Sequence, residues 1–499
     1  MSGRMRASGV ADAVRRLCDQ AEAVGLPDEL QARVIEARVR LDGPVRVAIA
    51  GRVKAGKSTL LNALVGERLA PTDAGECTRV VSWYREGLGY GVTAELLDGS
   101  TRDLSFERNG ALLIDLDDLT PEGLHRITVD WPSDRLASTT LIDTPGLASL
   151  DRTVSERTRQ ALAADGHGTP DADAVIYLMR HLHRVDAEFL EGFVSGSDAG
   201  ASPVNSITVL SRADEIGAGR LDAMDSARRV AAAYEADGRI SALSSRVVAV
   251  AGLVAETAQT LTEGEFQTLR ILAGLPAEVV GELLLSVDRF ASFDRDGVVA
   301  AIGVDAGTRE RLVERFGLFG LRFSLDRLRS GKATSTAQLA AALLIVSGLD
   351  GLRAALDAQI RPRAEVLQAR SVLLVLADVA DELATTDPER ARQLARALEE
   401  TVSAAHEFAE LRLAHLMATG MTMLSRDDTD RATRLVTPGP MSDRLGVASL
   451  PTAGRAQELM LAEIEHWRTL AANPAFDPVT VEACDIAARC AEGLYSTVA

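Results

Sequence analysis

Short apolar runs rich in β-branched residues recur along the middle of the chain, each followed by a stretch with helical periodicity. An apolar run of about five residues between turn residues is typical of a buried strand in a parallel sheet. Strand followed by helix, repeated several times, predicts a doubly wound α/β domain. That domain is expected over residues 43–361, and its central strands are expected at residues 45–50, 140–142, 174–178, 206–210 and 246–250.

Amphipathic helical stripes flank this domain on both sides. Apolar residues spaced three and four apart predict N-terminal helices over residues 1–42 and further helices over residues 362–499. We expect the two segments to form one antiparallel helical bundle. Within the α/β domain, residues 89–134 predict additional antiparallel strands, whereas residues 255–345 predict a long helical insertion. Residues 420–454 are rich in Thr, Asp, Arg, Pro and Gly, which predicts a long mobile loop.

The composition fits a largely helical protein with two or three domains. Its 499 residues are 46% hydrophobic but only 4% aromatic, which favours helices packed on helices. The formal net charge of −18, without a local basic patch, predicts that nucleic acid is not a partner. Four separated cysteines fit a reducing compartment. No signal-like run follows the N-terminus, and the apolar residues 339–346 are too few to cross a bilayer, so we expect a cytoplasmic or peripherally bound protein.

One glycine-rich stretch, residues 51–58, lies between a predicted strand and a predicted helix. It matches the phosphate-binding loop G-x-x-x-x-G-K-[ST], whose backbone N–H groups surround phosphate oxygens. The following helix N-terminus adds partial positive charge. Lys57 is expected to reach the β- and γ-phosphates, and the Ser58 hydroxyl to hold Mg²⁺. The residues expected to contact the phosphates here are Gly51, Val53, Lys54, Ala55, Gly56, Lys57, Ser58 and Thr59.

A second phosphate-side motif, Asp-Thr-Pro-Gly, begins at Asp143 directly after a predicted strand. In a nucleotide hydrolase, an aspartate at this place holds Mg²⁺ through water, and the glycine N–H, here that of Gly146, contacts the γ-phosphate. A threonine on a mobile loop between the two motifs completes the Mg²⁺ shell. Thr72 and Thr78 both lie in that interval, and the residues alone leave the choice open.

The base-binding motif of a GTPase is expected as N-K-x-D or T-K-x-D after a later strand. Here the strand over residues 206–210 is followed by Ser211, Arg212, Ala213 and Asp214. Asp214 can accept hydrogen bonds from guanine N1–H and N2–H, and the planar head of Arg212 can stack on the base. Ser211 departs from the amide or threonine that normally braces this loop, which weakens the prediction of guanine specificity. A last base-side contact is expected at Ala251 and Gly252.

The predicted catalytic apparatus departs from that of small GTPases. Leu147 stands where small GTPases carry a water-orienting glutamine. Charge that develops between the β- and γ-phosphates needs a cation, and Lys54 within the loop is placed to supply it. The alternative is that Lys54 points into solvent. The expected catalytic residues are Lys57, Lys54 and the loop threonine.

Together these motifs resemble the dynamin superfamily. The resemblance rests on the phosphate loop, on the run from Leu61 to Gly66, and on the downstream proline and Thr-Arg pair. More particularly the chain resembles the isoniazid-inducible dynamin-like proteins of actinobacteria, in their shorter C-type form. That closer likeness rests on residues 211–220 and 314–320.

The resemblance implies a GTPase domain with an α-helical bundle, and it selects Thr78 as the Mg²⁺-ligating threonine. Val53 and Lys54 replace the family's usual Gln and Ser, which favours the role of Lys54 as a cation. It further implies that GTP hydrolysis is coupled to dimerisation through the GTPase face and to membrane remodelling or membrane-stress repair at the inner face of the plasma membrane. The alternative is a soluble regulatory GTPase acting through a protein partner such as a longer dynamin-like paralogue.

Overall fold

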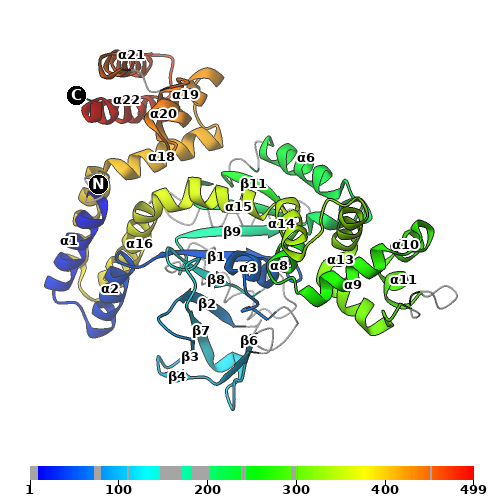
Figure 1. The fold of residues 1–499 in the computed structure, drawn as a ribbon. Helices are drawn as coiled ribbons and strands as arrows, with labels where there is room; N and C mark the ends of the chain where they lie inside the picture. Colours follow the sequence, from blue (N-terminus) through cyan, green and yellow to red (C-terminus); the bar gives the residue numbers. More distant parts are fainter. Residues whose placement is uncertain are drawn as a thin grey trace.

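A nine-stranded sheet forms the centre of the part of the chain that the structure describes (Figure 1). The structure is a computed structural model that describes residues 9–71, 80–108, 112–145, 171–180, 203–237, 240, 243–293, 299, 302–449 and 452–498. The strand order is β11-β10-β9-β1-β8-β2-β7-β3-β4. The strands are β1 (Val45–Gly51), β2 (Val81–Glu86), β3 (Gly91–Leu96), β4 (Thr101–Asp103), β7 (Leu124–Trp131), β8 (Thr139–Asp143), β9 (Ala174–Met179), β10 (Ser206–Ser211) and β11 (Arg246–Val250).

The strands β11, β10, β9, β1 and β8 run parallel to one another. They are almost entirely buried, as expected of apolar runs covered on both faces. Because β1 lies between β8 and β9, which both follow it in the chain, the chain diverges to either side of β1. Such a point leaves a crevice at the carboxyl ends of the strands, where ligands bind in open α/β sheets. The predicted α/β fold with a mainly parallel sheet is confirmed.

The polar segment 89–134 extends the sheet, as its sequence predicts. Strand β2 pairs antiparallel with β8 and parallel with β7, and β3 pairs antiparallel with both β7 and β4. Strands β5 (Phe106–Arg108) and β6 (Leu112–Ile114) form a separate hairpin. The alternating burial of β3 reflects a sheet with one covered face.

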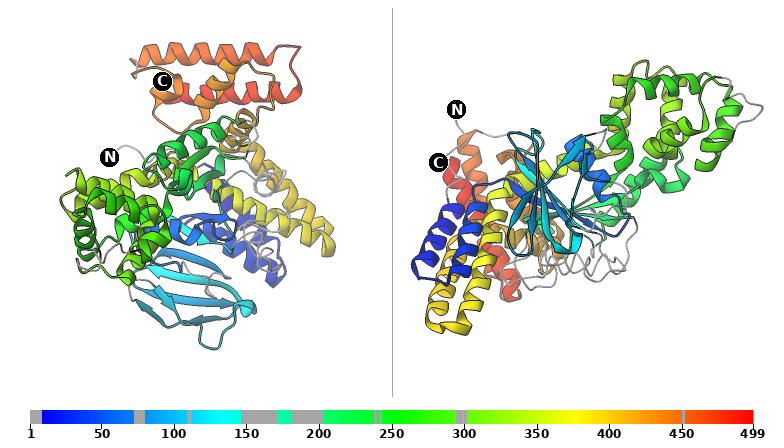
Figure 2. Two further views of the ribbon diagram at one scale, coloured as in Figure 1. Left: turned by 90° about the vertical axis from the view of Figure 1, so that its right-hand side faces the viewer. Right: turned by 90° about the horizontal axis from the view of Figure 1, so that it is seen from below.

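Helices cover the sheet and extend well beyond it (Figures 1 and 2). The group of helices that follows β11 projects away from the sheet, so the predicted helical insertion is present. Its Phe290, Phe316 and Leu339 are buried in a cluster that continues to the sheet residues Tyr177 and Leu210. The helices of the α/β part are α3 (Lys57–Val65), α6 (Ala223–Glu235), α8 (Gly252–Gln259), α9 (Glu263–Ala273), α10 (Ala277–Leu283), α11 (Val287–Ser292), α13 (Ala306–Arg329), α14 (Thr336–Ser347) and α15 (Leu349–Ala355).

The terminal helices bury two separate apolar clusters rather than one. The first contains side chains of α1 (Val10–Ala23), α2 (Asp28–Arg40), α16 (Ala364–Thr386) and α17 (Pro388–Ala404). The second contains side chains of α18 (His406–Thr419), α19 (Arg426–Val436), α21 (Ala453–Ala471) and α22 (Pro478–Val498). The break falls at Ala405, whose extended backbone separates α17 from α18. The first cluster confirms the predicted bundle of N- and C-terminal helices. The helices after Ala405 form a second cluster of their own, which the sequence did not predict because apolar stripes do not reveal which other stripe they contact.

The expectation of one long loop over residues 420–454 was also wrong. Helix α19 occupies part of it, with a shorter helix α20 (Met441–Leu445) after it. Ser425 caps α19 by accepting the N–H of Asp428. The apolar residues Ala432, Leu435 and Val436 are buried against the C-terminal helices. The polar residues of α19 face solvent, which explains why its composition resembles that of a loop.

A buried polar network at Asp173 joins the sheet to the first helical group. Asp173 Oδ1 lies 3.2 Å from Arg40 Nη2 of α2 and accepts the Ser371 hydroxyl of α16 at 2.7 Å. Asp173 Oδ2 accepts the N–H of Arg46 in β1 at 2.8 Å. Both side chains of this pair are buried, with 6% of the Arg40 side chain and 1% of the Asp173 side chain exposed. The network therefore connects the phosphate-loop strand with two flanking helices.

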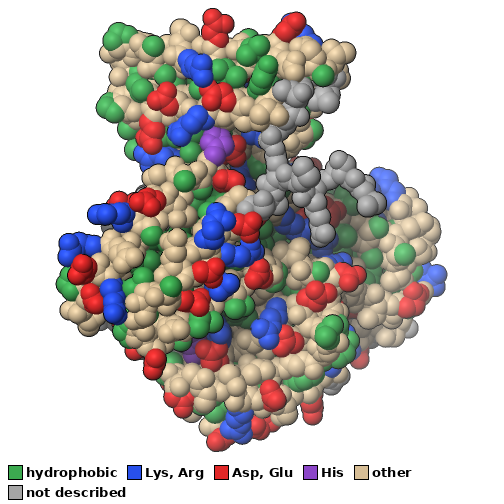
Figure 3. All heavy atoms as spheres, turned by 90° about the vertical axis from the view of Figure 1, so that its left-hand side faces the viewer, with side chains coloured by type: hydrophobic (Ala, Val, Ile, Leu, Met, Phe, Trp, Pro, Cys, Tyr) green, Lys and Arg blue, Asp and Glu red, His purple; other side chains and the backbone are tan. Residues whose placement is uncertain are grey.

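The described surface carries mixed charge. On the face shown in Figure 3, Lys and Arg side chains are interspersed with Asp and Glu, and neither sign forms an extended patch there. Among the described helices, no single one is long and apolar enough to cross a membrane. One bent pair, residues 336–347 and 349–386 with 57° between them, passes by length and composition alone.

Candidate functional site

The loop after β1 is shaped by glycines at both ends. Gly51 has φ +147°, and a Cβ there would lie 2.5 Å from the carbonyl oxygen of Leu178 in β9. The strand can therefore approach β9 this closely only with glycine. Gly56 has φ +94° and immediately precedes α3, so the loop turns directly into a helix N-terminus. This is the strand–loop–helix arrangement that binds phosphate through backbone N–H groups.

Lys57 lies over the loop from the first turn of α3. Its ammonium donates to the carbonyl oxygens of Gly51 at 3.3 Å and Arg52 at 3.4 Å. Burial lowers the pKa of Lys57, and the nearby carboxylate of Asp143 opposes that shift. A half-buried ammonium whose contacts here are carbonyl oxygens has capacity to contact an anion. The geometry therefore suits a lysine that binds phosphate oxygens.

Ser58 and Asp143 bring two oxygen donors together. Asp143 ends β8 at the level of Ile49 in β1, and its Oδ2 accepts the Ser58 hydroxyl at 2.8 Å. The other carboxylate oxygen, Oδ1, is buried and has no hydrogen-bond partner among the described residues. Burial raises the pKa of Asp143, while Lys57 and Ser58 lower it. An unpartnered buried carboxylate oxygen beside a hydroxyl fits a hard divalent cation such as Mg²⁺.

The predicted base loop lies at the same edge of the sheet. Ser211 ends β10, and its hydroxyl donates to the carbonyl oxygen of Met179 at 3.1 Å. Asp214 follows in a short 3₁₀ segment (η4, Ala213–Ala218), is 7% exposed, and has its pKa raised to about 6 by burial. Arg212 adopts the left-handed backbone conformation with φ +50°. A cavity of about 160 Å³ is lined by Ala55, Gly56, Thr59, Ser211, Arg212, Asp214 and Gly252, among others.

That cavity brings together predicted nucleotide residues from the phosphate loop and from the base loop. Ala251 is buried and is not among the residues that line the cavity; its N–H donates to the carbonyl oxygen of Ser347 at 2.8 Å. Val53 and Lys54 are exposed, and no hydrogen bond to the Lys54 side chain occurs among the described residues. Lys54 has φ +63°, a conformation that is uncommon for a residue with a side chain. Thr72, Thr78 and Gly146 lie outside the described residues.

Sequence reasoning missed several residues around the base end of the cavity. Glu215 lines the cavity, and its Oε1 accepts a hydrogen bond from Arg212 Nη1 at 2.8 Å. It also pairs with Arg180. Leu253 of α8 lines the cavity as well. An acidic residue three positions after an arginine is a sequence signal for the Arg212–Glu215 pair. Arg180 gives no such signal, because only the sheet brings the ends of β9 and β10 together.

The described residues contain one further cluster of metal-type donors. His406, Glu410 and Cys490 offer ligand atoms within 4.8 Å of one another. Arg444 lies 3.4 Å from the carboxylate of Glu410 and already supplies it with a positive charge. Asp143 Oδ1, which has no hydrogen-bond partner among the described residues, suits a cation better than this paired carboxylate.

Comparison with known proteins agrees with this geometry. Residues 47–196 match the Dynamin family. Over 461 residues the chain is 40% identical to the isoniazid-induced protein IniC of Mycobacterium tuberculosis, covering 92% of this chain and 91% of the relative. This chain belongs to the dynamin family. The predicted resemblance to the isoniazid-inducible dynamin-like proteins is thereby confirmed, and the match spans both the sheet and the terminal helices.

More distant members of the dynamin family match a shorter part of the chain or match it with lower similarity. The bacterial dynamin-like protein of Nostoc punctiforme is 36% identical over 85 residues, which is 17% of this chain and 12% of that protein. A solved structure described as an oligomerised bacterial dynamin pair, for long-range sensing and tethering of membranes, aligns with 12% identity and a TM-score of 0.31. That alignment covers 100% of this chain and 91% of the other.

Proposed function

We propose that this protein binds GTP with Mg²⁺ and hydrolyses it to GDP and phosphate. The observation that carries the proposal is the arrangement of two acidic groups at one edge of the sheet. Asp143, with its unpartnered Oδ1, lies beside the hydroxyl of Ser58 at the phosphate loop. Asp214 lines the cavity that begins at Ala55 and Gly56 of the same loop. A nucleotide spans such a pair, with phosphates at the loop and base at the buried carboxylate.

Each residue then has a definite role. The N–H groups at the start of α3 and the ammonium of Lys57 bind and orient the β- and γ-phosphates. Ser58, Asp143 and Thr78 hold Mg²⁺, which when bound neutralises the negative charge of the phosphate oxygens. Lys54 supplies positive charge in cis between the β- and γ-phosphates, where a small GTPase relies on other groups. Its exposed position in the loop leaves it free to turn toward a bound nucleotide.

Guanine is recognised in this proposal by Asp214. An ionised carboxylate accepts the N1–H and N2–H of guanine, whereas adenine presents an acceptor at N1 and would leave the buried carboxylate unpartnered. The guanidinium of Arg212, held by Glu215, is placed to stack on the base. Ser211 contacts the backbone of β9 and so anchors the end of β10.

The hydrolysis test compares Lys57→Ala with Lys332→Ala, which changes an exposed lysine far from the loop in sequence. We expect Lys57→Ala to lower kcat for GTP at least about 100-fold, because phosphate binding and charge stabilisation are both lost. Lys332→Ala should retain wild-type turnover. Phosphate release with GTP and with ATP would be measured for the wild type and for both variants. Equal turnover of the two nucleotides by the wild type would contradict guanine recognition by Asp214.

We further propose that GTP binding drives self-association through the nucleotide face and that the terminal helices transmit the change to a membrane. The support is the order of the parts: helices precede and follow the nucleotide domain, and the Asp173 network joins both sets to β1. The protein would then act at the inner face of the plasma membrane, in remodelling or in repair of membrane stress. Light scattering with GDP and with a non-hydrolysable GTP analogue would test the association.

The second candidate is a regulatory GTPase that acts through a protein partner such as a longer dynamin-like paralogue. The formal charge of −18 favours it, because anionic lipid repels an acidic protein. Co-sedimentation with anionic and with neutral vesicles, in the presence of GTP, separates the candidates. Pelleting that Lys57→Ala abolishes supports membrane remodelling. A wild type that never pellets with either vesicle supports the partner-dependent role.

A further inference from the structure

Helix α13 of the insertion breaks at the place where it passes the base loop. Gly317 has φ +62° and ψ 175°, a conformation that is essentially confined to glycine. A Cβ added at Gly317 would lie 3.6 Å from Asp214 Oδ2 and 3.6 Å from Leu253 Cδ2. The break therefore puts the backbone of the insertion in van der Waals reach of the carboxylate proposed to read guanine.

A second contact anchors the loop that carries Asp214. The Nη1 of Arg322, one helical turn and a half beyond Gly317, donates to the carbonyl oxygens of Ala218 and Gly219 at 2.7 Å each. Its Nε donates to the carbonyl oxygen of Leu284 at 3.2 Å, on the far side of the insertion. One guanidinium thus ties the end of the base loop to two parts of the insertion. A lysine cannot reproduce this fork.

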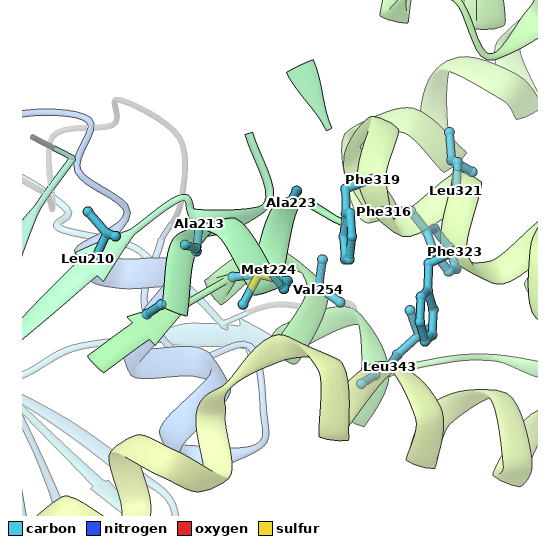
Figure 4. Packing of buried hydrophobic residues seen from close by; sticks show 14 of the residues in the cluster. Leu210, Ala213, Ala223, Met224, Val254, Phe316, Phe319, Leu321, Phe323 and Leu343 are labelled. Carbon is cyan, nitrogen blue, oxygen red and sulfur yellow. The ribbon is translucent and has the colours of Figure 1, made fainter. Parts of the chain in front are cut away.

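Apolar packing holds the same elements together. Phe316 and Phe319 of α13 are buried in one cluster with Ala213 of the base loop, Met224 of α6 and Val254 of α8 (Figure 4). Gly219 completes the contact, since a Cβ there would lie 3.2 Å from the N atom of Phe319. The base loop therefore rests against α13 at Asp214 and again at Ala218 and Gly219.

We propose that α13 is part of the guanine site and that Arg322 and Gly317 are positioning residues for Asp214. A larger amide or threonine side chain at the position of Ser211 would brace the loop. The hydroxyl of Ser211 donates to β9 instead, so in this proposal Arg322 and Gly317 support the loop. This inference rests on the proposed function, because it concerns the base that Asp214 reads. Selectivity for guanine is then set partly by a helix about 100 residues away in sequence. Arg322 is 104 positions from Ala218 and 103 positions from Gly219.

The test compares Arg322→Lys with Arg329→Lys in the same helix. Arg329 also forks onto backbone carbonyl oxygens, those of Ala273 at 3.1 Å and Leu275 at 2.7 Å, but it does not contact the base loop. The dissociation constants of fluorescent mant-GDP and mant-ADP would be measured with Mg²⁺, together with thermal unfolding. We expect Arg322→Lys to lower the GDP-over-ADP preference about tenfold, which corresponds to about 1.4 kcal/mol. KM for GTP should rise while kcat changes little.

Arg329→Lys should keep the preference, although it removes an equivalent contact between α13 and another part of the insertion. An equal loss in both variants, or a retained preference in Arg322→Lys, would overturn the inference. Gly317→Ala provides a second, independent variant, because alanine would straighten or strain the break beside Asp214. Its control is Gly281→Ala in α10, where an added Cβ meets nothing within 4 Å. Gly317→Ala should weaken mant-GDP binding more than mant-ADP binding, and Gly281→Ala should weaken neither.

Asp214→Asn separates this inference from the proposed function. If this variant leaves the GDP-over-ADP preference intact, Asp214 does not read guanine and the proposed base recognition fails. If Asp214→Asn abolishes the preference while the Arg322 and Gly317 variants retain it, only the role of α13 fails.

Discussion

Binding of guanine nucleotides should weaken as the pH falls from 7 to 5, because Asp214 becomes protonated. Burial raises the pKa of Asp214 to about 6, Glu215 acts in the same direction, and Arg212 and Arg180 oppose it. A protonated carboxyl has fewer acceptor sites for the two guanine N–H groups. Affinity is thus nearly complete at pH 7 and is lost as the pH falls through the pKa of about 6.

The size of this effect follows from the pKa. With a pKa of about 6, the ionised fraction of Asp214 is about 90% at pH 7 and about 10% at pH 5. The apparent Kd of mant-GDP should therefore rise about tenfold over this interval, or about 1.4 kcal/mol. The assay is a fluorescence titration at saturating Mg²⁺ and constant ionic strength.

The control is Asp214→Asn, whose amide does not titrate. Titration of the nucleotide phosphates and of Lys57 is common to both proteins, so the difference between their profiles isolates Asp214. The variant should bind mant-GDP more weakly at pH 7 and should lack the additional loss at pH 5. Parallel profiles for the two proteins would refute the reasoning, since they would assign the whole pH dependence to groups other than Asp214.

Three further outcomes are expected. Lys54→Ala should lower kcat for GTP about tenfold or more while mant-GDP binding changes less, and an unchanged kcat would remove Lys54 from the catalytic residues. Gly51→Ala should weaken mant-GDP binding at least about tenfold in a fluorescence titration, because its Cβ would lie 2.5 Å from the carbonyl oxygen of Leu178. Asp173→Ala should destabilise the protein by about 3 kcal/mol in urea denaturation, since Arg40 would remain buried without the carboxylate of Asp173. The exposed Asp225→Ala is its control and should cost less than about 0.5 kcal/mol.

The parts of the site that lie within one local segment were predictable from the sequence. Residues 51–58 carry their glycines and lysine in consecutive positions, and the loop conformation depends on these residues themselves. Asp143 and Asp214 were predictable because each directly follows an apolar strand, and parallel strands end at one edge of the sheet. The order of the strands is then sufficient to bring Asp143 beside Ser58 and to bring Asp214 to the cavity.

The contribution of α13 could not be read in the same way. Gly317 and Arg322 stand in a helical stretch whose pattern predicts only an amphipathic helix, and nothing local relates them to Asp214. Glu215 and Arg180 show the same limit, since their contact depends on β9 and β10 being neighbours. The N- and C-terminal helices show the same limit on a larger scale. Their sequences do not say which helices pack together, because one amphipathic stripe packs equally well against many others.

The sequence by itself therefore determined the secondary-structure alternation, the phosphate loop, the carboxylates at two strand ends and the membership of a GTPase-type fold. These features depend on periodicity and on short-range backbone requirements, which are encoded residue by residue. Only the tertiary structure decided that the terminal helices form two clusters, that Asp173 ties them to β1, and that α13 supports the base loop. Those features arise from contacts between separate elements, some of them far apart in sequence, as with Arg322 and Gly219 at 103 positions. Such contacts form only when the apolar faces of the elements pack together.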